Sequence, residues 1–144
     1  MEPYKKIKAQ DIYIEKKSVK GRIVAILDLV LEERELSLII PQSRALQKGE
    51  IHEIIFTEEE KGPGETVNKV GYIGFFEVDE GGLAIVGDVL EIGGIERAKL
   101  IGFNETHMPN HQNIVFLSHG LFTGKTLGIK LGDEVEIKKK EGKI

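Results

Sequence analysis

The 144-residue sequence contains no cysteine and no tryptophan, and it has only four asparagines and four glutamines. The absence of cysteine excludes disulfide scaffolds, thiol catalysis, iron–sulfur clusters and cysteine-type zinc sites. No apolar run approaches the roughly 18 residues of a membrane-spanning helix, and no signal-peptide-like apolar stretch follows the basic start. We therefore expect a cytoplasmic protein without membrane contact.

The charged residues also exclude a class of partner. The formal net charge of -4 argues against a general nucleic-acid-binding surface. Nineteen Glu and sixteen Lys outnumber five Asp and four Arg, and this enrichment is typical of proteins from hyperthermophiles. We expect a thermophilic source.

The length predicts one domain over residues 1–144, since domains most often have about 100–150 residues. Period-two alternation and short apolar runs bounded by glycine recur along the chain, and both patterns indicate strands. The nearly continuous apolar run at 22–31 is typical of a strand buried on both faces. We expect an all-β fold of about eight strands, drawn from the ranges 12–15, 22–31, 36–40, 51–57, 67–78, 83–92, 97–103, 113–117 and 133–139.

One short helix is predicted at Pro41–Gly49, because proline suits a first helical turn and glycine suits the stop. Residues 58–65, with three adjacent glutamates and a Gly-Pro-Gly turn, are typical of a solvated hairpin loop. The basic residues near the two ends are expected to be solvated charges on edge strands, with a weak polyanion contact as the alternative. They are Lys5, Lys6, Lys8, Lys16, Lys17, Lys20, Arg22, Lys138, Lys139 and Lys140.

A short repeat supports a closed barrel. Residues 87–92 read GDVLEI, and residues 132–137 read GDEVEI. In such a turn glycine allows a positive φ, while the aspartate carboxylate caps backbone N–H groups just before a strand. Paired turns of this kind favour a small closed or partly closed barrel whose two related halves interlock, and closure removes sheet edges.

The segment at 102–114 concentrates polar side chains that are scarce elsewhere. It holds two of the four histidines and three of the four asparagines, between two apolar strands. Loops on a rigid scaffold often carry binding groups. The candidate ligand-binding residues are Asn104, Glu105, Thr106, His107, Asn110, His111 and Asn113.

Three of these residues form a candidate metal site. Glu105, His107 and His111 supply one carboxylate and two imidazoles, which suit a divalent transition metal ion. The spacing of the histidines places both rings on one face only in a helix, and Pro109 argues against that helix. Loop ligands can also converge, with His119 as an additional donor.

Other interpretations of the loop stay open. The asparagines could satisfy loop backbone groups, or the histidines could bind a small polar or anionic molecule. An acid–base Glu/His pair is conceivable, but no nucleophile can be placed. The leading hypothesis is a protein that binds a small polar ligand or metal ion. The alternatives are a metal-dependent hydrolase or isomerase, and an assembly protein with this loop at a homo-oligomer interface. His52 alternates with apolar neighbours and is predicted to lie on a strand face.

The C-terminal half resembles the glucitol/sorbitol-specific IIA component of the sugar phosphotransferase system. The similarity lies in the Gly-Asp turn with its following strand and Gly-Gly pair at 87–94, in the pattern of Gly102, Glu105 and Pro109, and in the closing turn at 132–133. The resemblance implies a closed β-barrel of complex topology. That family is phosphorylated on a histidine in the strand before the first Gly-Asp turn, and the stretch 70–78 contains none. The resemblance therefore does not extend to phosphocarrier activity.

The segment at 104–113 is also similar to that of a group of small archaeal and bacterial proteins without an assigned activity. This second resemblance implies no reaction and no ligand.

Overall fold

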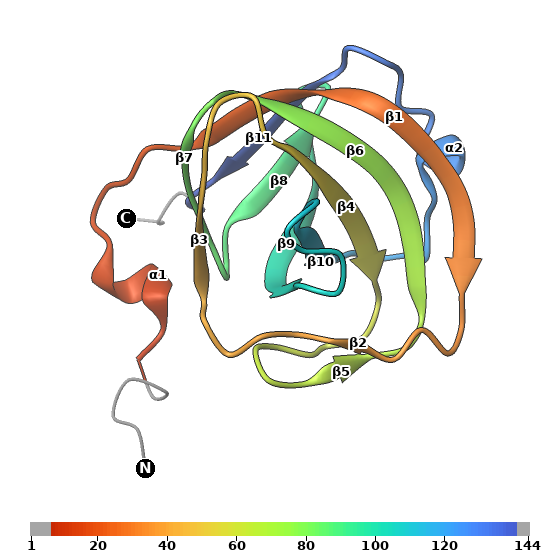
Figure 1. Cartoon of the computed structure of the whole chain (residues 1–144), viewed down its shortest axis with the longest axis horizontal. Helices are drawn as coiled ribbons and strands as arrows, with labels where there is room; N and C mark the ends of the chain where they lie inside the picture. The colour runs from red at the N-terminus through yellow and green to blue at the C-terminus, as the bar shows by residue number, and fades with distance from the viewer. Residues whose placement is uncertain (1–6, 141–144) are drawn as a thin grey trace.

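Seven strands close into a barrel in the computed structural model, which describes residues 7–140 (Figure 1). In spatial order these are β1 (Val19–Leu31), β11 (Glu134–Lys138), β8 (Val89–Ile92), β9 (Ile95–Asn104), β10 (Asn113–Leu117), β4 (Ile51–Thr57) and β6 (Val70–Glu80), and β6 pairs with β1 again. Neighbouring strands are antiparallel except for β10 and β4, which are parallel. The predicted all-β closed barrel is therefore confirmed.

Two small sheets lie against this barrel. One pairs β2 (Leu36–Ser37) with β5 (Thr66–Val67), and the other pairs β3 (Ser43–Leu46) with β7 (Gly82–Ile85). The two helices in the described part of the chain are single turns, α1 (Ala9–Ile12) and α2 (Gly124–Leu127). Neither has the length and apolar character that crossing a membrane requires.

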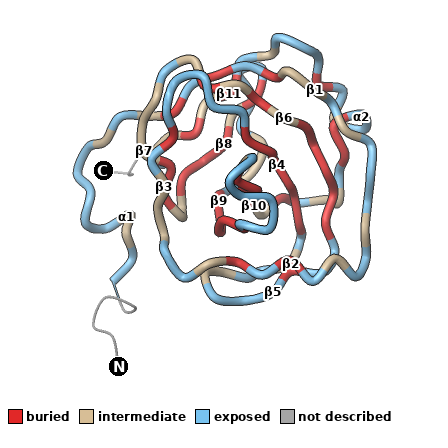
Figure 2. The backbone as a smooth tube through the Cα atoms, in the orientation of Figure 1, coloured by how far each residue is buried: buried red, intermediate tan, exposed pale blue. Residues whose placement is uncertain are grey.

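Figure 2 shows that most of β4 and β6 is buried, and apolar side chains of these two strands are covered on both faces of the barrel wall. Ile54 and Phe56 point into the barrel interior, whereas Ile55 between them belongs to a second cluster outside it. The β2–β5 sheet contributes Leu36 and Val67 to that outer cluster. Successive side chains in a strand point to opposite faces, so a continuous apolar run is needed wherever both faces are covered.

Both Gly-Asp turns form as predicted. Gly87 and Gly132 have φ angles of 100° and 88°. Asp88 Oδ2 accepts a hydrogen bond from Ile85 N at 2.9 Å, and Asp133 Oδ2 accepts one from Lys130 N at 2.8 Å. The turns lead into β8 and β11, which pair with each other. The repeat thus places equivalent turns before two adjacent strands.

Several local predictions are wrong. The segment Pro41–Gly49 contains strand β3 instead of a helix, because residues 43–46 pair with β7. Tertiary pairing outweighs the local helix signals here. The expected strand at 12–15 is also absent, since Ile12 ends α1. The expected strand at 83–92 is divided by the turn at Gly87 into β7 and β8.

The expectation for the basic residues holds only in part. Lys16 is buried, with a side chain 2% exposed, and its Nζ lies 2.8 Å from Asp88 Oδ2. Lys138 pairs with Glu91 at 2.7 Å. Lys5 and Lys6 lie outside the described residues. At least one of the N-terminal lysines, Lys16, is therefore a buried ion-pair partner and not a solvated charge.

Candidate functional site

The loop between β9 and β10 brings two predicted site residues together. Consecutive turns form it: Asn110 N donates to His107 O at 2.9 Å, and His111 N donates to the same oxygen at 3.3 Å. The Met108–Pro109 peptide bond inside these turns is cis. The ring centroids of His107 and His111 lie 5.1 Å apart without an α-helix. The two imidazole rings lie close together in consecutive turns, without the helix that Pro109 argued against.

Two asparagines at the base of the loop have structural contacts. Asn104 and Asn113 face each other across the β9–β10 ladder and are 3% and 1% exposed. Asn113 Nδ2 donates to Asn104 Oδ1 at 3.0 Å, and Asn104 Nδ2 donates to Ser37 O at 2.7 Å. Thr106 N also donates to Asn104 Oδ1, at 3.0 Å. These two side-chain amides hold the loop in place. For Asn104 this agrees with the interpretation that the asparagines satisfy backbone groups of the loop.

Glu105 does not join the histidine pair. Its carboxylate forms an ion pair with Arg44 of β3. His119 lies beyond the end of β10 and lines a separate cleft. Within residues 7–140, no three His, Cys, Asp or Glu side chains are grouped so that they could hold a metal ion. Of the three proposed metal ligands, His107 and His111 therefore lie together, whereas Glu105 is paired with Arg44.

A carboxyl from another strand contacts His111 instead. Glu53 of β4 is 5% exposed and lies opposite Asn113 in β10 and Phe75 in β6. Its Oε1 is 3.3 Å from His111 Nε2. The His111 ring meets Phe75 edge to face, with centroids 5.0 Å apart. Glu53 shares the outward strand face with Ile55, so this site is on the outside of the barrel.

Burial controls the ionisation of this pair. Desolvation raises the pKa of Glu53 to about 7, against the opposing effect of the positive charges of His107 and Arg34. Burial also lowers the pKa of His111, while a side-chain hydrogen bond with Asn113 acts in the other direction. Each shift disfavours the charged form. Near neutral pH the pair therefore holds a partly protonated carboxyl beside a mostly neutral imidazole.

Comparison with known proteins identifies the chain at family level. Residues 13–138 match the sequence profile of a family of unknown function, DUF6917. The chain belongs to DUF6917. No curated protein and no solved structure matches it. The matched range includes all barrel strands of this DUF6917 chain and both sides of the Glu53–His111 contact.

The inner side of the same DUF6917 strands carries a second polar contact. His52 lies on the inner strand face, where its Nδ1 accepts a hydrogen bond from Gln112 N at 2.9 Å. Its Nε2 lies 3.1 Å from Glu50 Oε1. The Gln112 side chain is buried, and neither its Nε2 nor its Oε1 has a hydrogen-bond partner among the described residues. The prediction that His52 is a strand-face residue is confirmed.

The sequence contains one signal for Glu53 that the loop-centred interpretation missed. Glu53 is the single acidic residue in the strand 51–57, and strict alternation places it on the face of Ile55. An acidic side chain beside a buried apolar one is unusual enough to single it out. Nothing in the local sequence pairs it with His111, which is 58 residues away.

Proposed function

We propose that this protein binds a small polar ligand on the outside of the barrel, where Glu53 contacts His111 and the His107 ring lies beside the His111 ring. The observation that carries the proposal is the buried carboxyl of Glu53. Among the described residues, its one ion-pair contact within 4.0 Å is His111, an imidazole whose own pKa is lowered. A desolvated carboxyl whose ion-pair contact is an imidazole and not a lysine or arginine favours a ligand that supplies a further positive charge or hydrogen-bond donor.

The surroundings of Glu53 define the chemistry of such a ligand. A donor or positive charge would face the carboxyl, and an acceptor would face an imidazole N–H. His107 and Asn110 lie in the exposed part of the loop and are accessible to solvent. Arg34 adds positive charge nearby, and its Nε is held by the Tyr72 hydroxyl at 2.8 Å. These groups suit a molecule that carries both a donor and an acceptor.

A divalent transition metal ion is the second candidate ligand. One carboxylate and two imidazoles are a common donor set for Zn(II), Mn(II) and Ni(II), and here Glu53 would replace Glu105 in the predicted set. Because these side chains are not grouped for a metal as they stand, His107 would have to turn toward Glu53. A metal-dependent hydrolase or isomerase would be the enzymatic form of this candidate.

Thermal unfolding followed by circular dichroism tests the proposal. The probes are Zn(II), Mn(II) and Ni(II) salts in one arm, and free amino acids, primary amines and polyols in the other. We expect at least one probe to raise the Tm of the wild type by several degrees and to leave Glu53→Gln and His107→Ala unshifted. Glu105→Gln is the matched control. It removes a carboxylate from the loop that carries His107, but the Glu105 carboxylate pairs with Arg44 and not with Glu53 or the histidine pair.

Two results would contradict the proposal. One is a panel in which no probe shifts the wild-type Tm, and the other is an equal shift in Glu53→Gln. If His107→Ala instead dissociates an oligomer in size-exclusion chromatography, the loop serves assembly and the third hypothesis replaces the first.

A further inference from the structure

A larger cleft lies elsewhere on the molecule, and none of its lining residues belongs to the Glu53 site. Its volume is about 1140 Å³. Five parts of the chain form most of its walls: residues 7–10 around α1, 40–42, the loop 61–65, the turn 86–87 and residues 99–101 of β9. Sites for small ligands typically enclose about 300–1000 Å³. The cleft is therefore large enough to hold an organic molecule.

The charge of this cleft is strongly positive. Lys8, Lys61, Lys99 and Lys140 line it, each from a different segment. None of the four has an ion-pair partner among residues 7–140. The single acidic residue of the lining is Glu65, whose Oε1 accepts a hydrogen bond from Gly62 N at 2.9 Å. In a protein of net charge -4, four unpaired lysines around one cleft form a local field that attracts anions.

Apolar side chains form the rest of the lining. Ile7 and Ile40 are 49% and 54% exposed there, and Val86 and Ile101 lie deeper. Large apolar side chains left open to water beside a cleft favour a ligand that covers them. The occupant should therefore combine an apolar body with an anionic group.

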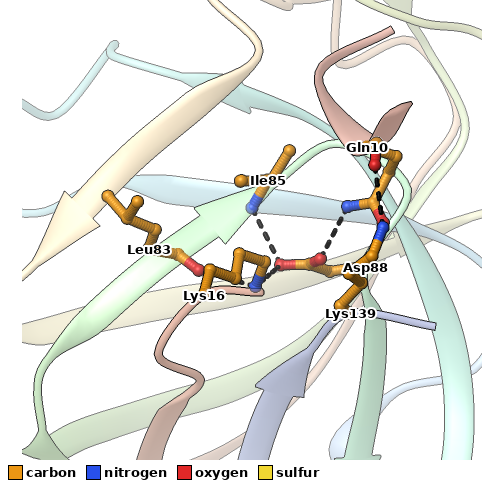
Figure 3. Close-up of polar contacts among 6 residues, drawn as sticks. All are labelled: Gln10, Lys16, Leu83, Ile85, Asp88 and Lys139. Atoms are coloured by element: carbon orange, nitrogen blue, oxygen red, sulfur yellow. Dashed lines mark hydrogen bonds and ion pairs between the residues drawn. The ribbon is translucent and has the colours of Figure 1, made fainter. Parts of the chain in front are cut away.

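Hydrogen bonds to the barrel hold the N-terminal wall of the cleft in place, as Figure 3 shows for Gln10 and Lys16. Gln10 Nε2 donates to Asp88 Oδ1 at 2.7 Å, and Lys139 Nζ donates to Gln10 O at 2.7 Å. Ala9 N donates to Gln42 Oε1 at 3.0 Å. The wall that carries Lys8 is thus fixed at several points, so the cleft is preformed.

We propose that this cleft binds a small amphiphilic anion, a molecule with an apolar body and a carboxylate or phosphate group. The lysines neutralise the anionic group, while the isoleucines and Val86 cover the apolar body. Both parts are required, because four lysines on an open surface do not distinguish one anion from another. The ligand is chemically different from the donor-bearing one proposed for Glu53.

Isothermal titration calorimetry with octyl phosphate and octanoate tests this inference. Inorganic phosphate and octanol are the comparison compounds, since each supplies only one half of the recognised chemistry. We expect octyl phosphate or octanoate to bind at least about tenfold more tightly than either comparison compound, and added salt to weaken the binding. The better of the two anions identifies the anionic group.

Matched variants locate the site. The double change Lys61→Gln with Lys99→Gln should weaken binding at least about tenfold, and Ile40→Ser should weaken it several-fold. Lys48→Gln, an exposed lysine outside the cleft, should leave it unchanged. Glu53→Gln should also bind normally, which separates this result from the proposal above. Equal binding by the double variant, equal weakening by Lys48→Gln, or no binding by the wild type would overturn the inference.

Discussion

Two buried carboxyls in this protein differ in how their charge is compensated. Asp88 is fully buried, yet its oxygens receive hydrogen bonds from Lys16 Nζ, Ile85 N and Gln10 Nε2, all within 2.9 Å (Figure 3). Glu53 is nearly as buried but has the His111 imidazole at 3.3 Å as its ion-pair contact. Burying a charge is costly unless it is paired and hydrogen-bonded.

The difference separates a structural carboxylate from a candidate functional one. Asp88 joins the N-terminal segment to the barrel, and the partners that make it stable leave no place for a ligand. Burial raises the pKa of Glu53 to about 7, against the opposing charges of His107 and Arg34, so this carboxyl is partly protonated near neutral pH. A carboxyl in that state can bind or exchange a proton when a ligand arrives.

The largest expected effect comes from removing the compensated carboxylate. Asp88→Ala leaves Lys16 buried without its partner, so it should lower the free energy of unfolding by about 3–5 kcal/mol. Asp133→Ala removes the equivalent carboxylate of the second, solvent-accessible turn and should cost about 1 kcal/mol. Urea unfolding followed by circular dichroism measures both. Equal losses in the two variants would show that the Lys16 contact adds nothing.

A pH-dependent effect should distinguish Glu53. Its folded pKa of about 7 lies above the ordinary value of 4.5, so between these pH values the unfolded chain ionises first. Wild-type stability therefore falls as pH rises through this window, and Glu53→Gln lacks that fall. We expect a relative gain for Glu53→Gln on the order of 2–3 kcal/mol between about pH 5 and about pH 8.

The difference between wild type and Glu53→Gln is the informative quantity. His111 has a lowered pKa, so its own contribution to stability is lost as pH falls, which is the opposite direction. If the free energy of unfolding changes with pH in the same way in both proteins, Glu53 has the same pKa in the folded and unfolded chain.

The smallest effect concerns an uncharged group beside the same strand. The side-chain amide of Gln112 is buried without a hydrogen-bond partner among residues 7–140, so Gln112→Leu should raise the free energy of unfolding by about 1 kcal/mol. The comparison sharpens if this gain appears without any change in the pH profile. If Gln112→Leu is instead less stable than the wild type, water or a ligand hydrogen-bonds to this amide in solution.

Predictions from local patterns succeeded where the determining interactions are local. The Gly-Asp turns at 87–88 and 132–133 depend on positive φ and on carboxylates that cap N–H groups three residues away. The strands follow from period-two alternation, which is a property of the extended backbone itself. The polar loop at 104–113 was found because its residue types are scarce elsewhere.

Predictions failed where distant residues determine the outcome. Pro41 and Gly49 are the helix signals of the segment 41–49, but residues 43–46 within it pair with β7. Glu105 is close to His107 in sequence, yet Arg44 holds its carboxylate. Lys16 was expected in solvent, and Asp88, 72 residues away, draws it into the interior.

The sequence by itself determined the all-β class, the closed barrel with its repeated turns, and the loop that carries two histidines. Only the tertiary structure decided that Glu53 contacts one of those histidines, His111, and that four lysines from separate segments surround one cleft. The physical reason is that a backbone pattern is set by neighbours a few residues apart. The charge balance of a site, in contrast, depends on which side chains the closed barrel brings within a few ångströms of each other.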